Sequence, residues 1–212
     1  MPLVKKPTLP APEPLPDDSA QSFADRRDLP ASLAAPAASV RRAAVRALAE
    51  AGDDEAVSVL CGRLPAETDG PVREAIFLAL AAIGGDAAVA GLLPLLSDED
   101  PALRNGAIET LQQLPRPVAP RMEALLADPD SDVRIFAVNV AGNLRHPDVE
   151  RWMLAVLRDD EHVNVVAAAI DTLAEVGTEA ACADLERVVQ RFPGDAFLAF
   201  TQRTALRRIR GG

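Results

Sequence analysis

Four arginines recur along this chain at an almost constant spacing, each at the start of a segment with helical periodicity. They are Arg41, Arg73, Arg104 and Arg134, separated by 32, 31 and 30 residues, and an aliphatic residue precedes each one. A repeat of this length is typical of small helical units that stack so that each unit packs on its neighbours. We therefore expect an elongated solenoid and not a globular fold around one central pocket.

The composition and the periodicity favour an all-α chain. Apolar residues make up 49% of the 212 residues but aromatic residues only 3%, so the core has to be built from aliphatic side chains. Alternation between apolar and polar residues, which a half-buried strand needs, does not persist anywhere. We expect about six repeats, each made of an A helix, a turn and a B helix. The predicted A helices lie near residues 28–35, 54–64, 86–96, 117–127, 147–158 and 178–192, and the B helices near 39–51, 71–83, 101–114, 131–144, 162–176 and 196–210.

The first four predicted B helices each carry one apolar stripe in a fixed relation to the arginine. In the first repeat Ala44, Val45 and Leu48 follow the arginine by three, four and seven residues, and the next three repeats have apolar residues at the same offsets. These offsets place the side chains on a single helix face, which we expect to form the core. The arginine position is taken by Val166 in the fifth repeat and by Ala199 in the sixth.

We call the four arginines the arginine ladder and predict a structural role for them. A cation in the first turn of a helix opposes the helix dipole at a cost of roughly 0.3–1 kcal/mol, so a partner has to compensate it. We expect each ladder arginine to pair with a turn aspartate of its own or the adjacent repeat, which would fix the stacking register. A ladder that binds an anionic ligand is the alternative, which the many turn carboxylates disfavour. The candidate partners are Asp69, Asp98, Asp100, Asp128, Asp130 and Asp132.

The first 27 residues differ from the rest of the chain. Six prolines fall within the first sixteen positions, and proline at this density favours an extended polyproline II conformation and blocks helices. We expect residues 1–27 to form a flexible tail, either a solvated linker or a segment that docks on a partner. Residues 28–212 are expected to form the repeat domain.

The sequence predicts a cytoplasmic location. The proline-rich start lacks the apolar core of a signal peptide, and no apolar run approaches the ~20 residues of a membrane span. The two cysteines, Cys61 and Cys182, lie far apart in the sequence, and we expect both to be reduced.

The repeat units resemble HEAT repeats, and more closely the short HEAT-like repeats first associated with phycobilisome lyases. The resemblance is carried by VRRAAVRALAEAG, VREAIFLALAAIG, LRNGAIETLQQLP and VRIFAVNVAGNLR, and it extends over roughly residues 28–210. It implies a right-handed α-solenoid whose B helices line a concave face that binds partners. The period of about 31 residues suits only the short form of the repeat, because ordinary HEAT repeats are longer.

Few residues point to catalysis or to a cofactor. The chain has two histidines, His146 and His162, and neither is followed by the glutamate of the paired ligands in HEAT-like hydroxylases. A metal site therefore lacks ligands, and no glycine-rich phosphate loop or nucleophilic triad is present. We expect a chain that is not an enzyme and binds no cofactor. A phycobilin-lyase-like or other cofactor-handling protein stays as the alternative.

The charge distribution disfavours nucleic acid as a partner. Residues 50–186 carry a formal charge of −17, whereas residues 187–212 carry +5. An acidic middle repels a phosphate backbone, so we expect no general binding of DNA or RNA.

Two surfaces remain as candidates for partner binding. Polar side chains beside the core stripe of the central B helices suit an extended or helical basic peptide, although an ordinary solvated face has the same composition. These residues are Asn105, Glu109, Gln112, Asn139, Asn143 and Asp171. The last helix carries a second cluster, which is either a polar cap or a patch for an acidic partner. Its residues are Arg203, Arg207, Arg208 and Arg210.

These observations together predict a non-catalytic scaffold or adaptor. It would use the concave B-helix surface to hold another protein or peptide, in a bacterial regulatory or assembly complex. We favour a monomer.

Overall fold

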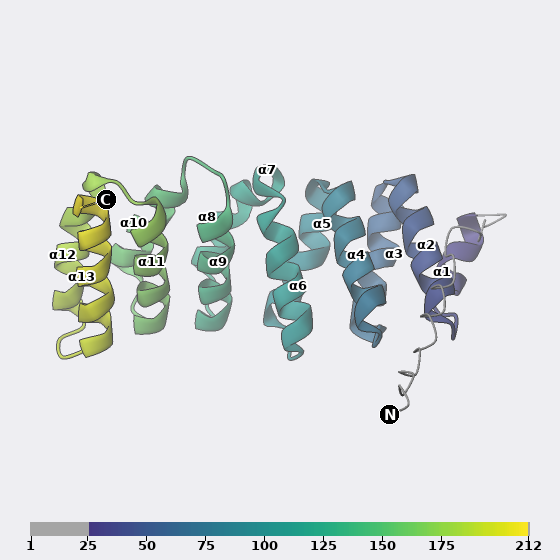
Figure 1. Cartoon of the computed structure of the whole chain (residues 1–212), viewed down its shortest axis with the longest axis horizontal. Helices are drawn as coiled ribbons and strands as arrows, with labels where there is room; N and C mark the ends of the chain where they lie inside the picture. Colours follow the sequence, from purple (N-terminus) through teal and green to yellow (C-terminus); the bar gives the residue numbers. More distant parts are fainter. Residues whose placement is uncertain (1–25, 212) are drawn as a thin grey trace, which may run out of the picture.

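The computed structural model describes residues 26–211, which form helices and turns without any strand. The B helices lie side by side in one row, and the A helices form a second row behind them (Figure 1). The B row consists of α2 (Ala38–Ala51), α4 (Gly70–Ile83), α6 (Pro101–Gln112), α9 (Ser131–Asn143), α11 (Val163–Val176) and α13 (Ala196–Gly211). The A row consists of α1 (Leu29–Ser32), α3 (Asp54–Arg63), α5 (Gly85–Leu92), α7 (Pro115–Val118), α8 (Met122–Leu126), α10 (Val149–Asp159) and α12 (Cys182–Arg191). Short 3-10 helices adjoin them at η2 (Arg26–Asp28), η3 (Leu64–Ala66), η4 (Leu93–Ser97), η5 (Ala119–Arg121) and η6 (Glu179–Ala181).

The predicted all-α solenoid is confirmed. Each B helix packs on the B helices before and after it and on an A helix of its own repeat, which is the nearest-neighbour contact pattern of a stacked array. The predicted tail of residues 1–27 lies outside the described residues, except that Arg26 and Arg27 begin η2. No helix among residues 26–211 is long and apolar enough to cross a membrane.

Several predicted A helices begin or end in a short 3-10 helix, and the one predicted over 117–127 is divided most strongly. We expected a single helix over 117–127, but the segment forms α7, η5 and α8 in succession. Pro117 and Pro120 explain the break, because proline lacks the N–H that an α-helix interior needs and its ring clashes with the preceding turn. Pro115 opens the segment at the first position of α7, where a proline is tolerated.

The turns before the B helices follow a common design. Asp100 and Asp130 cap α6 and α9, each accepting a hydrogen bond of 2.8 Å from a backbone N–H of the first turn. Asp69 caps α4 in the same way. Gly52 ends α2 with a left-handed φ of 64°, whereas Gly177 ends α11 in an extended conformation.

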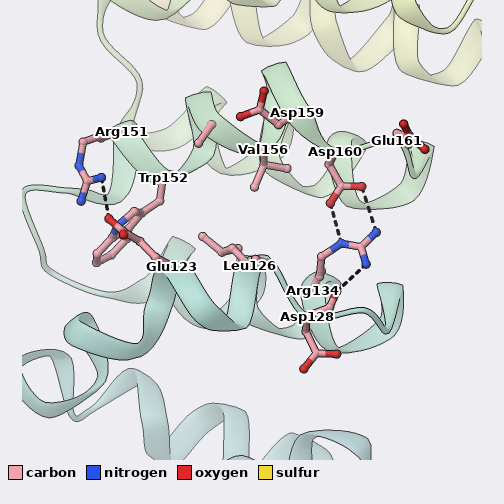
Figure 2. A pocket seen from close by; sticks show the side chains of 12 residues that line it. Glu123, Leu126, Asp128, Arg134, Arg151, Trp152, Val156, Asp159, Asp160 and Glu161 are labelled. Atoms are coloured by element: carbon pink, nitrogen blue, oxygen red, sulfur yellow. Dashed lines mark hydrogen bonds and ion pairs between the residues drawn. The ribbon is translucent and has the colours of Figure 1, made fainter.

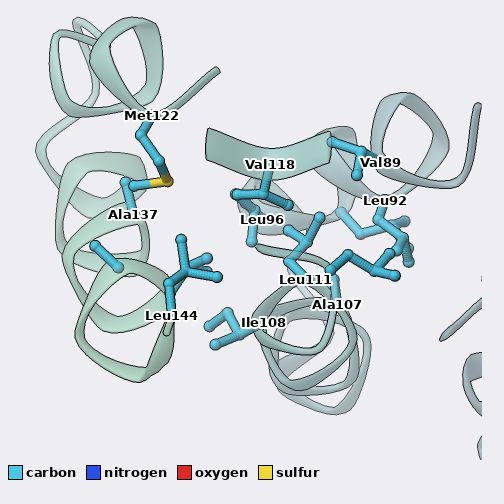
Figure 3. Close-up of a cluster of buried hydrophobic side chains, with 14 of the residues drawn as sticks. Val89, Leu92, Leu96, Ala107, Ile108, Leu111, Val118, Met122, Ala137 and Leu144 are labelled. Carbon is cyan, nitrogen blue, oxygen red and sulfur yellow. The ribbon is translucent and has the colours of Figure 1, made fainter. Parts of the chain in front are cut away.

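The core runs continuously between the two rows. The apolar stripe predicted for the first four B helices is buried throughout. Figure 3 shows its middle part, where Leu111 of α6 lies near Leu92, Leu96 and Val118 of the A row. Trp152 is also buried, with 3% of its surface exposed. Burial raises the pKa of the Cys61 thiol to about 11, so this thiol is protonated and unreactive at neutral pH.

Candidate binding surface

The arginine ladder lies along one edge of the B row. Every ladder arginine donates hydrogen bonds to backbone carbonyl oxygens in the turn that precedes its own helix. Arg41 donates to the carbonyls of Ala35 and Pro36 at 2.9 Å, and Arg134 donates to those of Asp128 and Pro129 at 2.8 and 3.3 Å. Each guanidinium group therefore holds its own turn against its own helix.

Three ladder arginines also pair with a carboxylate in the next repeat. The pairs are Arg41 with Glu67 at 2.8 Å, Arg73 with Asp100 at 3.0 Å and Arg134 with Asp160 at 2.7 Å. The first and third pairs are bidentate, since two guanidinium nitrogens contact two carboxylate oxygens. The partners are always in the following repeat, and two of them, Glu67 and Asp160, were absent from the predicted set. These geometries support the proposal that the ladder fixes the register between repeats.

Glu67 is the most buried of the carboxylates that pair with ladder arginines, with a side chain that is 0% exposed. It accepts hydrogen bonds from Arg41, from Arg63 at 2.9 Å and from the backbone N–H of Asp69 at 2.9 Å. Burial by itself raises the pKa of Glu67, but the hydrogen bonds and the charge of Arg63 outweigh burial and lower the pKa from 4.5 to about 2. The carboxylate is therefore held in its charged form across a wide pH range.

This shift predicts an acid-sensitive contribution to stability. Because the pKa in the folded state lies below its ordinary value, the contribution is complete above pH 4.5 and is lost as the pH falls towards 2. A shift of this size corresponds to roughly 3 kcal/mol of unfolding free energy. We expect urea denaturation at pH values within that window to show a steeper loss for the wild type than for Glu67→Gln, which has no carboxyl group to titrate. Parallel curves would contradict the assignment.

Arg104 is the one ladder arginine without a carboxylate partner among the described residues. It donates to the backbone carbonyls of Asp98 and Glu99 at 2.7 and 3.0 Å, but it forms no ion pair within residues 26–211. Its guanidinium carbon lies 5.6 Å from the ring centroid of Phe136. Phe136 occupies the position two residues after a ladder arginine, where the other B helices of the first five repeats have alanine or glycine. The prediction of an aspartate partner is therefore wrong for Arg104, and a cation–π contact takes its place.

The six residues predicted to bind a partner all lie on the B row, on α6, α9 and α11. Five are exposed, and Gln112 is half-buried. Gln112 donates from its side-chain amide to the backbone carbonyl of Asn139 at 2.9 Å, and Asn143 donates to the same carbonyl at 3.2 Å. Gln112 thus links α6 to α9, whereas the hydrogen bond of Asn143 stays within α9. Burial raises the pKa of Asp171, an effect that the charge of Arg208 opposes.

One line of side chains crosses five successive B helices. In each helix its member stands five residues after the ladder arginine, or after Val166 in the fifth repeat. We call it the B-row line, and all five of its members are exposed. The B-row line consists of Arg46, Leu78, Glu109, Asn139 and Asp171. Leu78 stands out because it is 59% exposed although it is a large apolar residue. A single exposed leucine is common on protein surfaces, so its meaning depends on the groove beside it.

A groove of about 390 Å³ opens between α4 and α6 beside Leu78. Asn105 and Glu109 line it, together with Phe77 and Gly106. A Cβ atom on Gly106 would come within 2.2 Å of the Phe77 ring, so glycine is needed there for the ring to lie against the α6 backbone. The structure thus brings two of the six predicted residues into one groove and leaves the other four outside it.

A larger pocket of about 580 Å³, which was not predicted from the sequence, lies in the A row between α8 and α10. Figure 2 shows Leu126 of α8 facing Trp152 and Val156 of α10, with ion pairs at both ends of the pocket. One pair joins Arg151 to Glu123 at 2.8 Å, and the other is the ladder pair of Arg134. In the sequence, only the acidic run 159–161 on its rim could have pointed to this site. The pocket itself forms only because two A helices stack on each other.

Two of the four arginines predicted to cluster on the last helix have a carboxylate partner, and two do not. Arg208 forms an ion pair with Glu175, and Arg210 pairs with Glu186 at 2.5 Å. Within the described part of the chain, Arg203 and Arg207 form neither a hydrogen bond nor an ion pair. Only these two arginines are therefore available to a partner.

The residues considered for metal binding do not come together. Among residues 26–211 no group of three or more His, Cys, Asp or Glu side chains could hold a metal ion. His146 stacks on Trp152 with 5.0 Å between ring centroids, and its Nδ1 accepts a hydrogen bond from the backbone of Asp148. It therefore serves as a turn residue.

The comparisons with known proteins agree with this architecture. A family model described as HEAT repeats matches residues 28–112 and 118–196. No curated protein matches the chain. Among solved structures, the CpcE–CpcF complex of phycocyanin lyase from Nostoc sp. PCC7120 is 18% identical, with 92% of this chain and 98% of that chain covered and a TM-score of 0.38. A designed armadillo repeat protein in complex with the peptide (KR)4 is also 18% identical, with 86% and 98% covered and a TM-score of 0.40.

Proposed function

This chain belongs to the HEAT-repeat family, and from its B-row surface we propose that it is a non-catalytic scaffold that holds a segment of another protein. The segment would lie across the B helices from α4 to α11. We place this scaffold, as a monomer, in a bacterial regulatory or assembly complex of the cytoplasm.

The groove between α4 and α6 is the observation that carries the proposal. It combines an exposed apolar side chain, Leu78, with the carboxylates of Glu74 and Glu109. The B-row line continues from there through Asn139 to Asp171, so the surface becomes a strip of amides and carboxylates. A basic peptide with an apolar side chain that enters the groove fits this chemistry, because the charges are complementary and the apolar contact excludes water.

The test is the affinity of the chain for an identified partner, because capture of a protein from a lysate does not by itself show specific binding. The wild-type chain is used as bait, the captured protein is identified by mass spectrometry, and its affinity is then measured with purified components. We expect Glu109→Arg combined with Asn139→Arg to weaken that affinity by at least about tenfold, because both changes add positive charge to the strip.

A charge-matched control separates the strip from a general effect of charge. Asp54→Arg combined with Ser58→Arg makes the same change in net charge at two exposed positions on α3, in the A row. We expect this control to bind the partner like the wild type. Equal affinity of the strip variant and the wild type would remove the B-row surface as the binding site. A saturable absorbance change on titration with a tetrapyrrole would instead favour a cofactor-handling protein.

A further inference from the structure

Two phenylalanines are unusually exposed on α13. Phe197 and Phe200 are 62% and 60% exposed, whereas most large apolar side chains of the described residues are buried. They are three residues apart on one helix, so their side chains lie on the same side of it. Exposed aromatic side chains that occur together mark interaction sites more often than isolated ones do.

Two arginines extend this side of the helix. Arg203 and Arg207 follow Phe200 by three and seven residues and are exposed, and within residues 26–211 neither has a carboxylate partner. We call Phe197, Phe200, Arg203 and Arg207 the aromatic–arginine face. The opposite side of α13 is the one that packs on the repeat stack, through Leu198, Thr201, Gln202 and Ala205.

A hollow next to this face can receive an apolar side chain. It has a volume of about 270 Å³ and lies between the end of α12 and the start of α13. Val189, Phe192, Ala196 and Ala199 form its apolar lining, and Gly194 and Asp195 complete the rim. Ala196 and Ala199 each precede one of the exposed phenylalanines on α13, so the hollow and the face are contiguous.

From these features we infer that the aromatic–arginine face binds a negatively charged helical segment of a protein partner, with apolar side chains flanked by carboxylates. Guanidinium groups pair with carboxylates in bidentate geometry, and aromatic and arginine side chains dominate the energetics of interfaces. The surrounding segment, residues 187–212, has a formal charge of +5 in a chain of net charge −10. Two copies docked through α13 would bring arginines against arginines, which disfavours self-association through this face.

This site is separate from the proposed peptide strip. It lies on α13, whereas the strip runs from α4 to α11. The variant with Glu109→Arg and Asn139→Arg is therefore expected to bind an acidic helical peptide at the aromatic–arginine face as tightly as the wild type. Failure of one proposal is thus distinguishable from failure of the other.

The test uses a defined probe and the full chain. The probe is a fluorescent helical peptide with leucines at i, i+3, i+4 and i+7 and glutamates beside them, and a matched peptide carries lysines in place of the glutamates. Fluorescence anisotropy should show saturable binding of the acidic peptide and at least about tenfold weaker binding of the basic one. Phe200→Ser combined with Arg207→Glu should weaken binding of the acidic peptide by at least about tenfold.

A second variant with the same change in net charge is the control. Arg208→Gln combined with Arg210→Gln alters the two arginines that already pair with Glu175 and Glu186, and we expect less than about a threefold effect. Equal losses in both variants, or equal binding of both peptides, would overturn the inference. So would a wild-type dimer that Phe200→Ser dissociates, or binding to phosphatidylserine vesicles in place of the acidic peptide.

Discussion

Glu67→Gln is expected to lower the free energy of unfolding by about 3–5 kcal/mol, because it leaves buried arginine charge without a compensating carboxylate. The Glu67 side chain is fully buried between Arg41 and Arg63 and also accepts a hydrogen bond from the turn backbone. For a domain of this size each kcal/mol corresponds to about 2–4 °C, so the melting temperature should fall by roughly 10 °C. Thermal unfolding followed by circular dichroism measures this change.

Asp128→Asn is the matched control for that variant. Asp128 holds the same place in its turn and accepts the same kind of hydrogen bond, from the backbone N–H of Asp130 at 2.9 Å. Within residues 26–211 it forms no ion pair with an arginine. We expect a loss of about 1 kcal/mol or less. Similar losses in the two variants would show that the charge of the turn acceptor, and not the ion pair with the arginines, is what Glu67 contributes.

Trp152→Ala is expected to destabilise the protein by about 3–5 kcal/mol, because it opens a large cavity in the core between α8 and α10. The side chain is 3% exposed and stacks on His146. Its indole Nε1 is buried and has no hydrogen-bond partner within the described residues. Trp152→Phe therefore loses volume but no hydrogen bond, and it should cost only about 1.5 kcal/mol.

Urea denaturation of the two Trp152 variants distinguishes packing from polar contributions. If Trp152→Phe destabilises the protein as much as Trp152→Ala does, the indole nitrogen contributes to the free energy of unfolding. The described residues provide no hydrogen-bond partner that would explain such a contribution. Trp152 also lines the pocket between α8 and α10, so only the difference between the two variants reports on core packing.

The architecture was predictable because each repeat is a local unit. The spacing of the ladder and the offsets of the apolar stripe depend only on helix geometry within one repeat, and the stripe is buried where those offsets placed it. The prediction of a single helix over 117–127 was wrong although Pro117 and Pro120 stand in the sequence, since prolines inside a helical pattern end it. The exposure of Glu109 and Asn139 follows from the same helix geometry.

The features that depend on two repeats at once were not predictable. Glu67 lies 26 residues after Arg41, and the sequence does not distinguish its carboxylate from the other turn carboxylates. Phe136 replaces a carboxylate partner at Arg104 only because its ring reaches the preceding repeat. The groove beside Leu78 likewise arises from the contact between Phe77 and Gly106, on two different helices.

Because Arg104 forms no ion pair within residues 26–211, the ladder pairs are unevenly distributed along the stack. Ladder pairs join the first repeat to the second, the second to the third and the fourth to the fifth. Between α6 and α9 the described residues contribute a cation–π contact and an amide hydrogen bond instead. In an array whose cohesion is a sum of nearest-neighbour couplings, bending concentrates at the weakest coupling. We therefore expect any bending of the stack to be largest between α6 and α9, beside the proline-broken segment 115–121, and the B-row line crosses this step between Glu109 and Asn139.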